Sequence, residues 1–407
     1  MDRTRQEGQV GRRRVFYIPG YDPLPARRYR EIYRREAARQ GAVSGHAIAI
    51  SPRHDPEQYG WHVEAEIEGA PVVADVEVLG WSDIVRRSMD ISIAGTYLLL
   101  ARTAWIYASS GALGRLVRLR KGPVIAAFYP VAMLLGQGAA AGLAGWGGGA
   151  LAGAVLHPLA GWAAGIALAI ALLRGFRRLD GRLYAHYLLH DYAFSARHRG
   201  ANPPEIEERL ARFRSRIAQA LESGELDEVL VVGHSSGAHL AVNIVADILR
   251  GGGPRPEGPA LSLLTLGQVV PMVSFLPGAG RLRADLRLLS TSDEITWVDV
   301  SAPGDGCCFA LCDPVAVSGV APAQGRRWPL VISAAFSRTL SPARWRALRW
   351  RFFRLHFQYL HAFDRPGDYD YFRITAGPLS LGARYAGRRP SKSRIDTPLS
   401  PHRSMAA

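Results

Sequence analysis

A serine flanked by glycines is the side chain in this sequence best placed to act as a nucleophile. The segment GHSSG sets Ser235 between Gly233 and Gly237 and fits the pattern G-x-S-x-G. The apolar run 228–232 before it predicts a strand, and 237–250 after it predicts a helix. A sharp turn between two such elements needs glycines beside the serine, because larger side chains would collide there. We therefore expect an activated hydroxyl at Ser235; the alternative is a serine that only caps the helix.

The turn and three further segments resemble the α/β-hydrolase superfamily, in particular its bacterial lipase-like and esterase-like serine hydrolases. The further segments are FYIPGY at 16–21, WVDVSAPGD at 297–305 and LHFQYL at 355–360. The resemblance leaves out both termini and a long apolar insertion. It implies a doubly wound, mostly parallel sheet and catalytic residues in the chain order Ser, Asp, His.

The segment FYIPGY is similar to the superfamily's oxyanion loop. It follows an early strand, but Pro19 stands where a histidine is more usual. The resemblance implies that the backbone N–H of Tyr21 donates one hydrogen bond to a developing oxyanion. The N–H of Ser236 is the expected second donor, because the start of the following helix points it toward the reacting centre.

An aspartate after a later strand is the expected acid of the triad. The segment WVDVSAPGD predicts a strand that runs into a loop presenting Asp305, which is similar to the acid position of lipase-like members. Asp299 and Asp313 remain alternatives, because strand ends predicted from sequence carry an error of about two to four residues.

A histidine near the carboxyl end is the expected base. His356 completes the order Ser, Asp, His, and His361 in the same segment is the alternative. A serine hydroxyl becomes a good nucleophile when an imidazole takes its proton and a carboxylate holds the imidazole in the required tautomer. We expect Ser235 to form an acyl-enzyme with His356 as base and then acid. His234 is expected to be structural or to line the pocket, because adjacent residues in a sharp turn seldom face each other.

The three cysteines lie close together at Cys307, Cys308 and Cys312. An odd number in one short segment is not the disulfide framework of a secreted domain, so we expect a reducing compartment. No histidine or fourth cysteine lies nearby at zinc-ligand spacing. The first residues are charged and lack the apolar core of a secretory signal. The sequence predicts neither a bound metal nor a cofactor.

The net charge of +15 points to an anionic partner. Basic residues cluster in both tails and on either side of the apolar insertion, without a zinc-finger pattern or a basic stripe interleaved with aromatic residues. This distribution favours an anionic membrane surface as the partner. Nucleic-acid binding through the tails is the alternative, and such binding would weaken steeply with salt.

The apolar insertion predicts a transmembrane hairpin. Residues 123–173 contain no Asp, Glu, Lys or Arg, and this run is more than twice the length of about 20 residues that one spanning helix requires. We expect passes at 124–145 and 150–173 with a turn at 146–149, and a kink at Pro158 in the second pass. Glycines spaced four apart would let the two helices approach closely. A buried hairpin in a soluble protein is the alternative.

Flanking charge predicts that both ends of the hairpin lie on the cytoplasmic side. The basic residues concerned are Arg115, Arg118, Arg120, Lys121, Arg174, Arg177, Arg178 and Arg182. A hairpin returns the chain to the side that it left, so the sequence before and after it can form one catalytic unit. The apolar segment 91–110 contains Arg102, and we expect an interfacial or packed helix there rather than a third span.

Strands alternating with helices predict an α/β fold, an α/β-hydrolase-like doubly wound and mostly parallel sheet with the inserted two-helix hairpin. The expected strands are 14–18, 46–50, 61–67, 72–79, 228–232, 261–266 and 295–300, and the expected helices are 26–40 (ending at Gly41), 204–223 and 237–250. The chain divides into a basic flexible start (1–13), two parts of one core (14–90 and 174–381), an interfacial or cap helix region (91–122), the hairpin (123–173) and a basic disordered tail (382–407).

These observations predict a membrane-anchored serine hydrolase that cleaves carboxylic esters of lipid-like or other acyl substrates at the bilayer surface. A thioesterase or an acyltransferase would use the same residues. A membrane scaffold that has this fold without turnover is the alternative from another class, because a fold alone does not establish activity.

Overall fold

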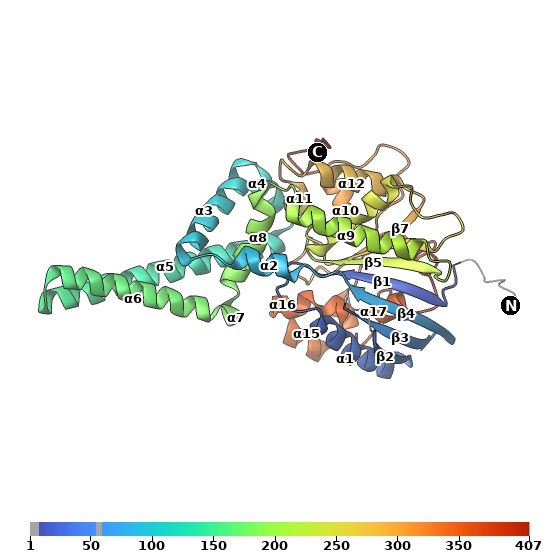
Figure 1. Cartoon of the computed structure of the whole chain (residues 1–407), viewed down its shortest axis with the longest axis horizontal. Coiled ribbons are helices and arrows are strands. Elements are labelled where there is room, and N and C mark those ends of the chain that lie inside the picture. Colours follow the sequence, from blue (N-terminus) through green and yellow to red (C-terminus); the bar gives the residue numbers. More distant parts are fainter. Residues whose placement is uncertain (1–7, 54–58, 407) are drawn as a thin grey trace.

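An eight-stranded sheet with helices on both faces forms the body of the chain, and a helical hairpin projects from one end of it (Figure 1). The computed structural model describes residues 8–53 and 59–406. The strands lie in the order β2-β3-β4-β1-β5-β6-β7-β8. Their bounds are β1 Arg12–Ile18, β2 Ala47–Arg53, β3 Gly60–Ile67, β4 Ala70–Val78, β5 Glu228–His234, β6 Ala260–Leu266, β7 Ile295–Ser301 and β8 Leu330–Ser333.

The described sheet is mostly parallel. β3 pairs antiparallel with β2 and β4, whereas β4, β1, β5, β6, β7 and β8 pair in parallel. The α/β class and the mostly parallel sheet predicted from sequence are confirmed. β8 is not among the predicted strands, because its four residues are too few to show a clear periodicity. Strands β1 to β4 precede the apolar insertion and β5 to β8 follow it, so both parts of the chain build one sheet.

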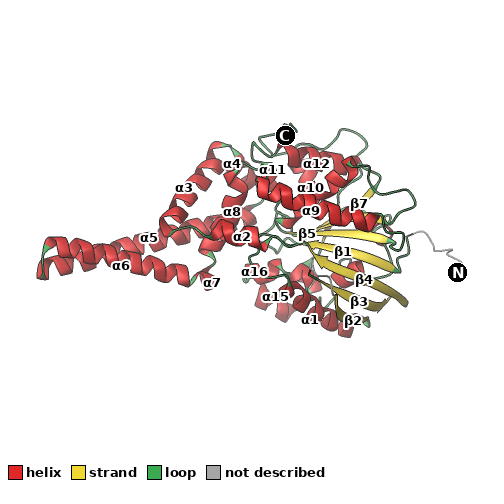
Figure 2. Ribbon diagram, viewed as in Figure 1, coloured by secondary structure: helices red, strands yellow, loops and turns green. Residues whose placement is uncertain are grey.

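Different helices cover the two faces of the sheet (Figure 2). One face carries α1 (Arg27–Ser44), α15 (Pro342–Leu348), α16 (Phe352–His356) and α17 (Tyr371–Ala376), and the other carries α9 (Pro204–Leu221), α10 (Gly237–Arg250) and α12 (Gly280–Thr291). Alternate residues of β1 point to opposite faces, because successive side chains of a strand alternate. Val15 and Tyr17 pack in the first core, and Phe16 and Ile18 pack in the second.

Helix α1 shows how a glycine can mislead a boundary prediction. The helix was expected to end at Gly41, but it continues to Ser44 and ends at Gly45, whose φ is 73°. Gly41 lies inside the helix because the chain returns over it: a Cβ there would lie 2.5 Å from the carbonyl oxygen of His46. Close approach, not termination, is the reason for this glycine.

Seven helices between β4 and α9 form an inserted unit, residues 82–197. They are α2 Ser82–Met89, α3 Ile93–Ser109, α4 Ala112–Leu119, α5 Lys121–Val155, α6 Pro158–Arg178, α7 Asp180–Leu183 and α8 Ala185–Arg197. The segment 91–110 forms α3, which packs against α8 and exposes Leu98 and Trp105. Within the described residues, α5 and α6 are the two helices long and apolar enough to cross a membrane.

The turn of the hairpin lies elsewhere than predicted. α5 runs unbroken through 146–149 to Val155, and α6 begins at Pro158, so the predicted passes 124–145 and 150–173 are wrong in their bounds. Glycines at 145 and 149 sit inside α5 because α6 crosses them: Cβ atoms there would lie 2.6 Å from the Gly165 carbonyl oxygen and 2.8 Å from that of Gly161. Pro158 causes no kink, because the first residue of a helix needs no N–H donor.

The first half of α5 belongs to the body of the protein rather than to the projecting hairpin. Val124 packs with a cluster that includes Phe275, and Leu134 packs with Leu189 of α8. The apolar composition of this half led the sequence analysis to count it within the membrane. One face of this half instead packs against protein, whereas Ile125, Phe128 and Leu135 on its other face are exposed.

The chain ends also differ from expectation. The start 1–13 was predicted to be flexible, and residues 1–7 of it lie outside the described residues. Strand β1 already begins at Arg12, and Arg13 forms a buried ion pair of 2.5 Å with Glu228. The tail 382–407, predicted to be disordered, runs along the body over its described part. Backbone hydrogen bonds of 2.8 Å join Ser391 to Val331 and Ile395 to Leu311. Backbone pairing, which composition does not reveal, places this tail.

The close approach of α5 and α6 predicts that Gly161 tolerates no side chain. A Cβ there would lie 2.5 Å from the carbonyl oxygen of Gly149, so Gly161→Leu must push the helices apart. We expect a loss of about 1–3 kcal/mol of stability, as for other overpacked sites. Thermal unfolding of the full chain in detergent measures this loss. The control Ala164→Leu, on the exposed side of α6, should change the melting temperature little; equal effects of the two substitutions would contradict the packing described.

Candidate active site

Ser235 occupies a strained turn between β5 and α10. Its φ of 56° lies in the left-handed region, which a non-glycine residue seldom adopts. Gly233 and Gly237 have no room for side chains: a Cβ at Gly237 would lie 2.3 Å from the Ile18 carbonyl oxygen, and one at Gly233 would lie 2.7 Å from the Gly237 carbonyl oxygen. The serine is partly exposed although its neighbours are buried. The strand, turn and helix predicted around this residue are confirmed.

The turn lies at the carboxyl edge of the sheet, where the chain direction across the sheet reverses. From β1 the chain proceeds toward the β2 edge, and from β5 it proceeds toward β8, so β1 and β5 border a switch point. Ligands of open α/β sheets bind in the crevice at such a point. The loops after β1 and β5 touch there: a Cβ at Gly20 would lie 2.9 Å from the Ser235 Cβ.

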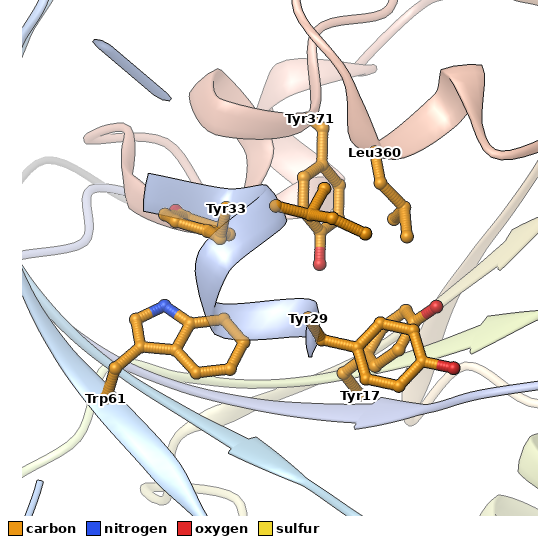
Figure 3. Close-up of a pocket in the computed structure, with 7 residues that line it drawn as sticks. Tyr17, Tyr29, Tyr33, Trp61, Leu360 and Tyr371 are labelled. Carbon is orange, nitrogen blue, oxygen red and sulfur yellow. The ribbon is translucent and has the colours of Figure 1, made fainter. Parts of the chain in front are cut away.

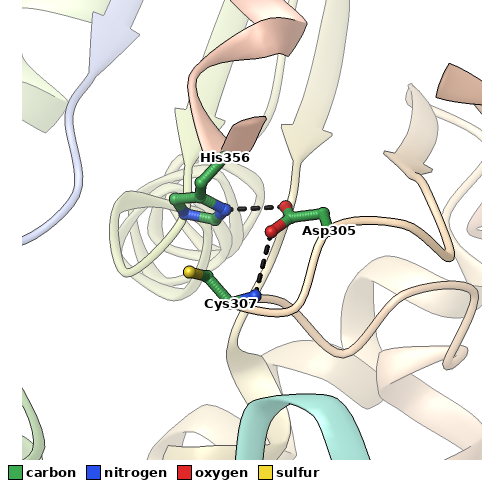
Figure 4. Close-up of side chains that lie close together, drawn as sticks. All are labelled: Asp305, Cys307 and His356. Atoms are coloured by element: carbon green, nitrogen blue, oxygen red, sulfur yellow. Dashed lines mark hydrogen bonds and ion pairs between the residues drawn. The ribbon is translucent and has the colours of Figure 1, made fainter. Parts of the chain in front are cut away.

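Asp305 and His356 form a buried pair at the same edge (Figure 4). Asp305 lies in the loop after β7 and His356 at the end of α16, and 2.7 Å separates Asp305 Oδ2 from His356 Nδ1. The Tyr359 hydroxyl donates to the same carboxylate at 3.0 Å, and the Cys307 N–H donates at 2.9 Å. Burial raises the pKa of Asp305, but His356, the Cys307 N–H and the Cys308 thiol outweigh burial and hold the pKa below its usual range.

The pair fixes the orientation and the tautomer of the imidazole. With Nδ1–H donating to the Asp305 carboxylate, Nε2 carries the free lone pair of a neutral histidine. The His356 ring lies against Gly267, where a Cβ would be 3.2 Å from His356 Cε1. The residue before Gly267, Leu266, accepts the backbone N–H of Ser235 at 2.9 Å. His356 therefore stands beside the turn that carries the serine.

The serine hydroxyl itself is not engaged. In the described part of the chain, Ser235 Oγ makes no hydrogen bond, to His356 or to another residue. The hydrogen bond between a nucleophile and its base is often long in unliganded enzymes and tightens when substrate binds. The absence of a Ser235–His356 hydrogen bond here is therefore compatible with a catalytic pair. The structure thus joins the predicted acid to the predicted base and places both beside the predicted nucleophile.

His234 supports the base instead of replacing it. Its Nε2 lies 3.0 Å from the carbonyl oxygen of His356 and must donate to it, so Nδ1 can accept from the Tyr17 hydroxyl at 3.4 Å. Burial lowers the pKa of His234 to about 3, which keeps the ring neutral. The structural role expected for this residue matches its contacts.

The three alternative residues lie in other environments. His361 Nδ1 is bonded to the Phe357 carbonyl oxygen at 2.7 Å, and Asp313 caps α13 (Pro314–Val317) and pairs with Arg326. Asp299 accepts a hydrogen bond from Thr265 at 2.6 Å inside the sheet. None of the three is hydrogen-bonded to Ser235, Asp305 or His356 among the described residues. Their contacts favour Asp305 and His356.

The two expected oxyanion donors lie free beside the serine. Among residues 8–53 and 59–406, the backbone N–H groups of Tyr21 and Ser236 have no hydrogen-bond acceptor. The loop that carries Tyr21 is held from several sides: the Trp81 indole donates to the Pro19 carbonyl oxygen at 2.9 Å, and the Tyr187 hydroxyl donates to the Tyr21 carbonyl oxygen. Helices of the inserted unit therefore position this loop.

Asp191 of α8 is a site residue that the sequence analysis missed. Its Oδ1 accepts from the Ser236 hydroxyl at 3.2 Å. Desolvation raises its pKa to about 7, against the opposing effects of Ser236 and the charge of His356. Tyr359, whose hydroxyl donates to Asp305, was also missed, although it lies in the LHFQYL segment. Asp191 had no such signal, because its position in the fold depends on how the inserted unit docks.

Three side chains could converge on a cation. Asp305, Cys307 and His356 each offer a ligand atom, all within 4.8 Å of one another (Figure 4). Burial raises the pKa of the Cys307 thiol well above its usual range, which opposes the thiolate that a metal binds. His356 Nδ1 already donates to Asp305. The donor set therefore suits a hydrogen-bonded acid and base better than a metal.

A cavity beneath the sheet is too small to act as a substrate site. It has a volume of about 10 Å³, room for roughly one water molecule, and lies between α1 and the sheet (Figure 3). Its lining residues are Tyr17, Tyr29, Ile32, Tyr33, Trp61, Leu360 and Tyr371. The indole N–H of Trp61 is buried without a partner among the described residues.

No family model matches the chain, and no curated protein or solved structure matches it either. The chemistry assigned to the site therefore rests on its residues and their geometry.

The buried carboxyl of Asp299 predicts a pH-dependent stability. Desolvation raises its pKa from 3.8 to about 8 in the fold, so the folded chain holds this proton more tightly than the unfolded chain. This group therefore lowers the stability progressively as pH rises from about 4 to about 8. Asp299→Asn should raise the melting temperature at pH 9 by at least about 2 °C and should have little effect at pH 4.

Thermal unfolding of the full chain at the two pH values measures this difference. The exposed Asp293→Asn serves as the matched control and should show no such dependence. A melting-temperature difference for Asp299→Asn that is the same at both pH values would contradict the neutral, buried carboxyl.

Proposed function

We propose that this protein is a membrane-anchored serine hydrolase of the α/β-hydrolase type that cleaves carboxylic esters through an acyl-enzyme on Ser235. The observation that carries the proposal is the strained turn at Ser235 beside a buried imidazole that is oriented by a carboxylate. The mostly parallel sheet and the chain order Ser, Asp, His add support.

The geometry suits a two-step acyl transfer. Nε2 of His356 takes the Ser235 proton while the serine oxygen attacks the ester carbonyl, and the imidazolium then donates that proton to the leaving alcohol. Asp305 stays ionised and stabilises the imidazolium through the bond at Nδ1. Water activated by His356 then hydrolyses the acyl-enzyme and releases the acid.

Two backbone N–H groups and the Asp191 carboxyl lie where negative charge would develop on the carbonyl oxygen during the attack. The N–H groups of Tyr21 and Ser236 hold the oxyanion that forms on the carbonyl oxygen. Asp191 lies against Ser236, and at the raised pKa its carboxyl is largely neutral below about pH 7. A neutral carboxyl adds no repulsion to the oxyanion, which is the state compatible with this role.

The position of the hairpin supports a substrate that partitions into a bilayer. The inserted unit leaves the sheet at its carboxyl edge, the edge that carries the site, and α5 starts beside the loop of the acid: a Cβ at Gly122 would lie 3.5 Å from the Gly306 Cα. Exposed apolar side chains follow the hairpin to its tip, among them Trp146, Leu151 and Trp162. Lipid-like esters near an anionic, cytoplasmic membrane surface fit this arrangement, with basic residues flanking both ends of the hairpin.

Three other functions are the alternatives to an ester hydrolase. A thioesterase or an acyltransferase would form the same acyl-enzyme and differ in the group that leaves or accepts. A membrane scaffold without turnover would keep the fold but would have no reactive serine. A nucleic-acid-binding protein would use the basic tails and would not depend on the hairpin or on Ser235.

An activity-based probe tests the catalytic proposal. A fluorophosphonate should label the full chain covalently, because an activated serine displaces fluoride from phosphorus. Ser235→Ala should abolish labelling, and Asp305→Asn should slow it by about ten-thousand-fold, the cost of the wrong imidazole tautomer in a related triad. In-gel fluorescence measures the labelling, and circular dichroism verifies that each variant is folded.

Matched variants separate the proposal from its alternatives. The exposed Ser215→Ala on α9 and the buried Asp299→Asn should both retain labelling. Labelling should persist in EDTA, because the proposed chemistry uses no metal. A well-folded chain that the probe does not label would support the scaffold and overturn the enzyme.

Membrane anchoring is tested by removing the outer half of the hairpin. The full chain should float with anionic vesicles in a density gradient and resist alkaline carbonate extraction. A variant with residues 138–172 replaced by a short Gly/Ser linker should stay at the bottom of the gradient, because the remaining half of α5 packs on the body. Its labelling by the probe verifies that the site is folded. Flotation of both chains would show that the hairpin is not the anchor.

A further inference from the structure

A crevice at the base of the hairpin combines apolar walls with three arginines. It lies between α3 and α6 and has a volume of about 660 Å³. Its lining residues are Ile93, Ala94 and Tyr97 from α3, and Ile170, Leu173, Arg174, Arg177 and Arg178 from α6. The α6 residues recur at intervals of three and four and so share one face of the helix.

The guanidinium groups in the crevice lack protein counter-ions. Within residues 8–53 and 59–406, no carboxylate pairs with Arg174, Arg177 or Arg178. The carboxylate of Asp180, just beyond them in the chain, is used in capping α8: its oxygens accept the backbone N–H groups of His186 at 2.8 Å and Tyr187 at 3.0 Å. The crevice is therefore positively charged and complementary to an anion.

The polarity of the crevice changes along the hairpin axis. The 21 residues of α6 span about 31 Å at 1.5 Å per residue, close to the thickness of a bilayer's hydrocarbon core. The arginines lie in the last two turns, at headgroup depth for an inserted hairpin. Ile170 and Leu173 lie deeper, at the depth of acyl chains. Tyr97, whose hydroxyl donates to the Leu134 carbonyl oxygen at 2.9 Å, fixes the opposite wall to α5.

We propose that this crevice binds one anionic glycerophospholipid, with its phosphate on the three arginines and an acyl chain along the apolar wall. The shared chemistry of the ligand is a phosphate, and the apolar wall commits the crevice to a lipid in place of free phosphate. Basic pockets between membrane helices bind such headgroups by charge and by depth. This inference rests on the membrane anchoring proposed above, and it is independent of the chemistry at Ser235.

Native mass spectrometry of the full chain in detergent micelles tests the site. Titration with phosphatidylglycerol should give a one-lipid adduct, and phosphatidylcholine should bind much more weakly. Arg174→Gln/Arg177→Gln/Arg178→Gln should weaken phosphatidylglycerol binding by about a hundredfold, as expected for the loss of three charges at a lipid surface. The control Arg102→Gln/Arg115→Gln/Arg118→Gln removes three exposed arginines of the same inserted unit outside the crevice and should leave binding within about twofold.

Each other outcome has a defined meaning. Equal weakening by both triple variants, or several equivalent adducts without a preferred first one, would overturn a specific site. Displacement of the lipid by glycerol phosphate at similar concentration would show that the crevice takes phosphate alone and would overturn a lipid site. If the full chain floats with vesicles but gives no lipid adduct, the lipid site is overturned and the proposed membrane anchor stands. If the full chain does not float, the membrane anchor itself is overturned. Probe labelling should be unchanged in both variants.

Discussion

The left-handed backbone of Ser235 is the constraint on which the site depends. A residue at φ 56° between β5 and α10 lifts its hydroxyl out of the sheet, and the turn closes only if Gly20, Gly233 and Gly237 lack side chains. Those close approaches bring the loop after β1 against Ser235, and with it the N–H of Tyr21. The left-handed turn at Ser235 and the close packing of β1, β5 and α10 around it thus require each other. Strain of this size persists only where the surrounding packing enforces it.

The inserted unit helps to build the site and is not a separate attachment. Its helix α8 carries Tyr187 and Asp191, and Trp81 directly precedes its first helix, α2. Each of these side chains bonds to the loop after β1 or to the turn after β5. The same unit carries the hairpin and packs the first half of α5 on the body. Helix α8 packs against α3 and α5 and also bonds to the loop after β1 and to the turn after β5, so it connects the base of the hairpin to the site.

The sequence predicted features that depend on local pattern and failed where tertiary contact decides. The apolar run before Ser235 and the order of Ser235, Asp305 and His356 were visible because each has a local signature. The turn of the hairpin was predicted in the wrong place because glycines are typical of turns and helix ends. Gly149 instead lies inside α5, where α6 packs closely against it. Asp191 could not be found, since its neighbour Ser236 lies far away in sequence. The tail was judged by composition, which does not report backbone pairing.

Two buried aspartates near the end of β7 show why burial alone does not identify the acid. Both are removed from water, which by itself raises the pKa of a carboxyl. Asp299 has one hydroxyl donor and, among the described residues, an oxygen without a partner, so burial raises its pKa to about 8. Asp305 has an imidazole, a phenol and a backbone N–H, and its pKa falls. An ionised Asp305 carboxylate accepts the Nδ1–H of His356 and so favours the tautomer in which Nε2 carries the lone pair. Donors from His356, Tyr359 and Cys307 thus converge on Asp305, the aspartate that faces the imidazole.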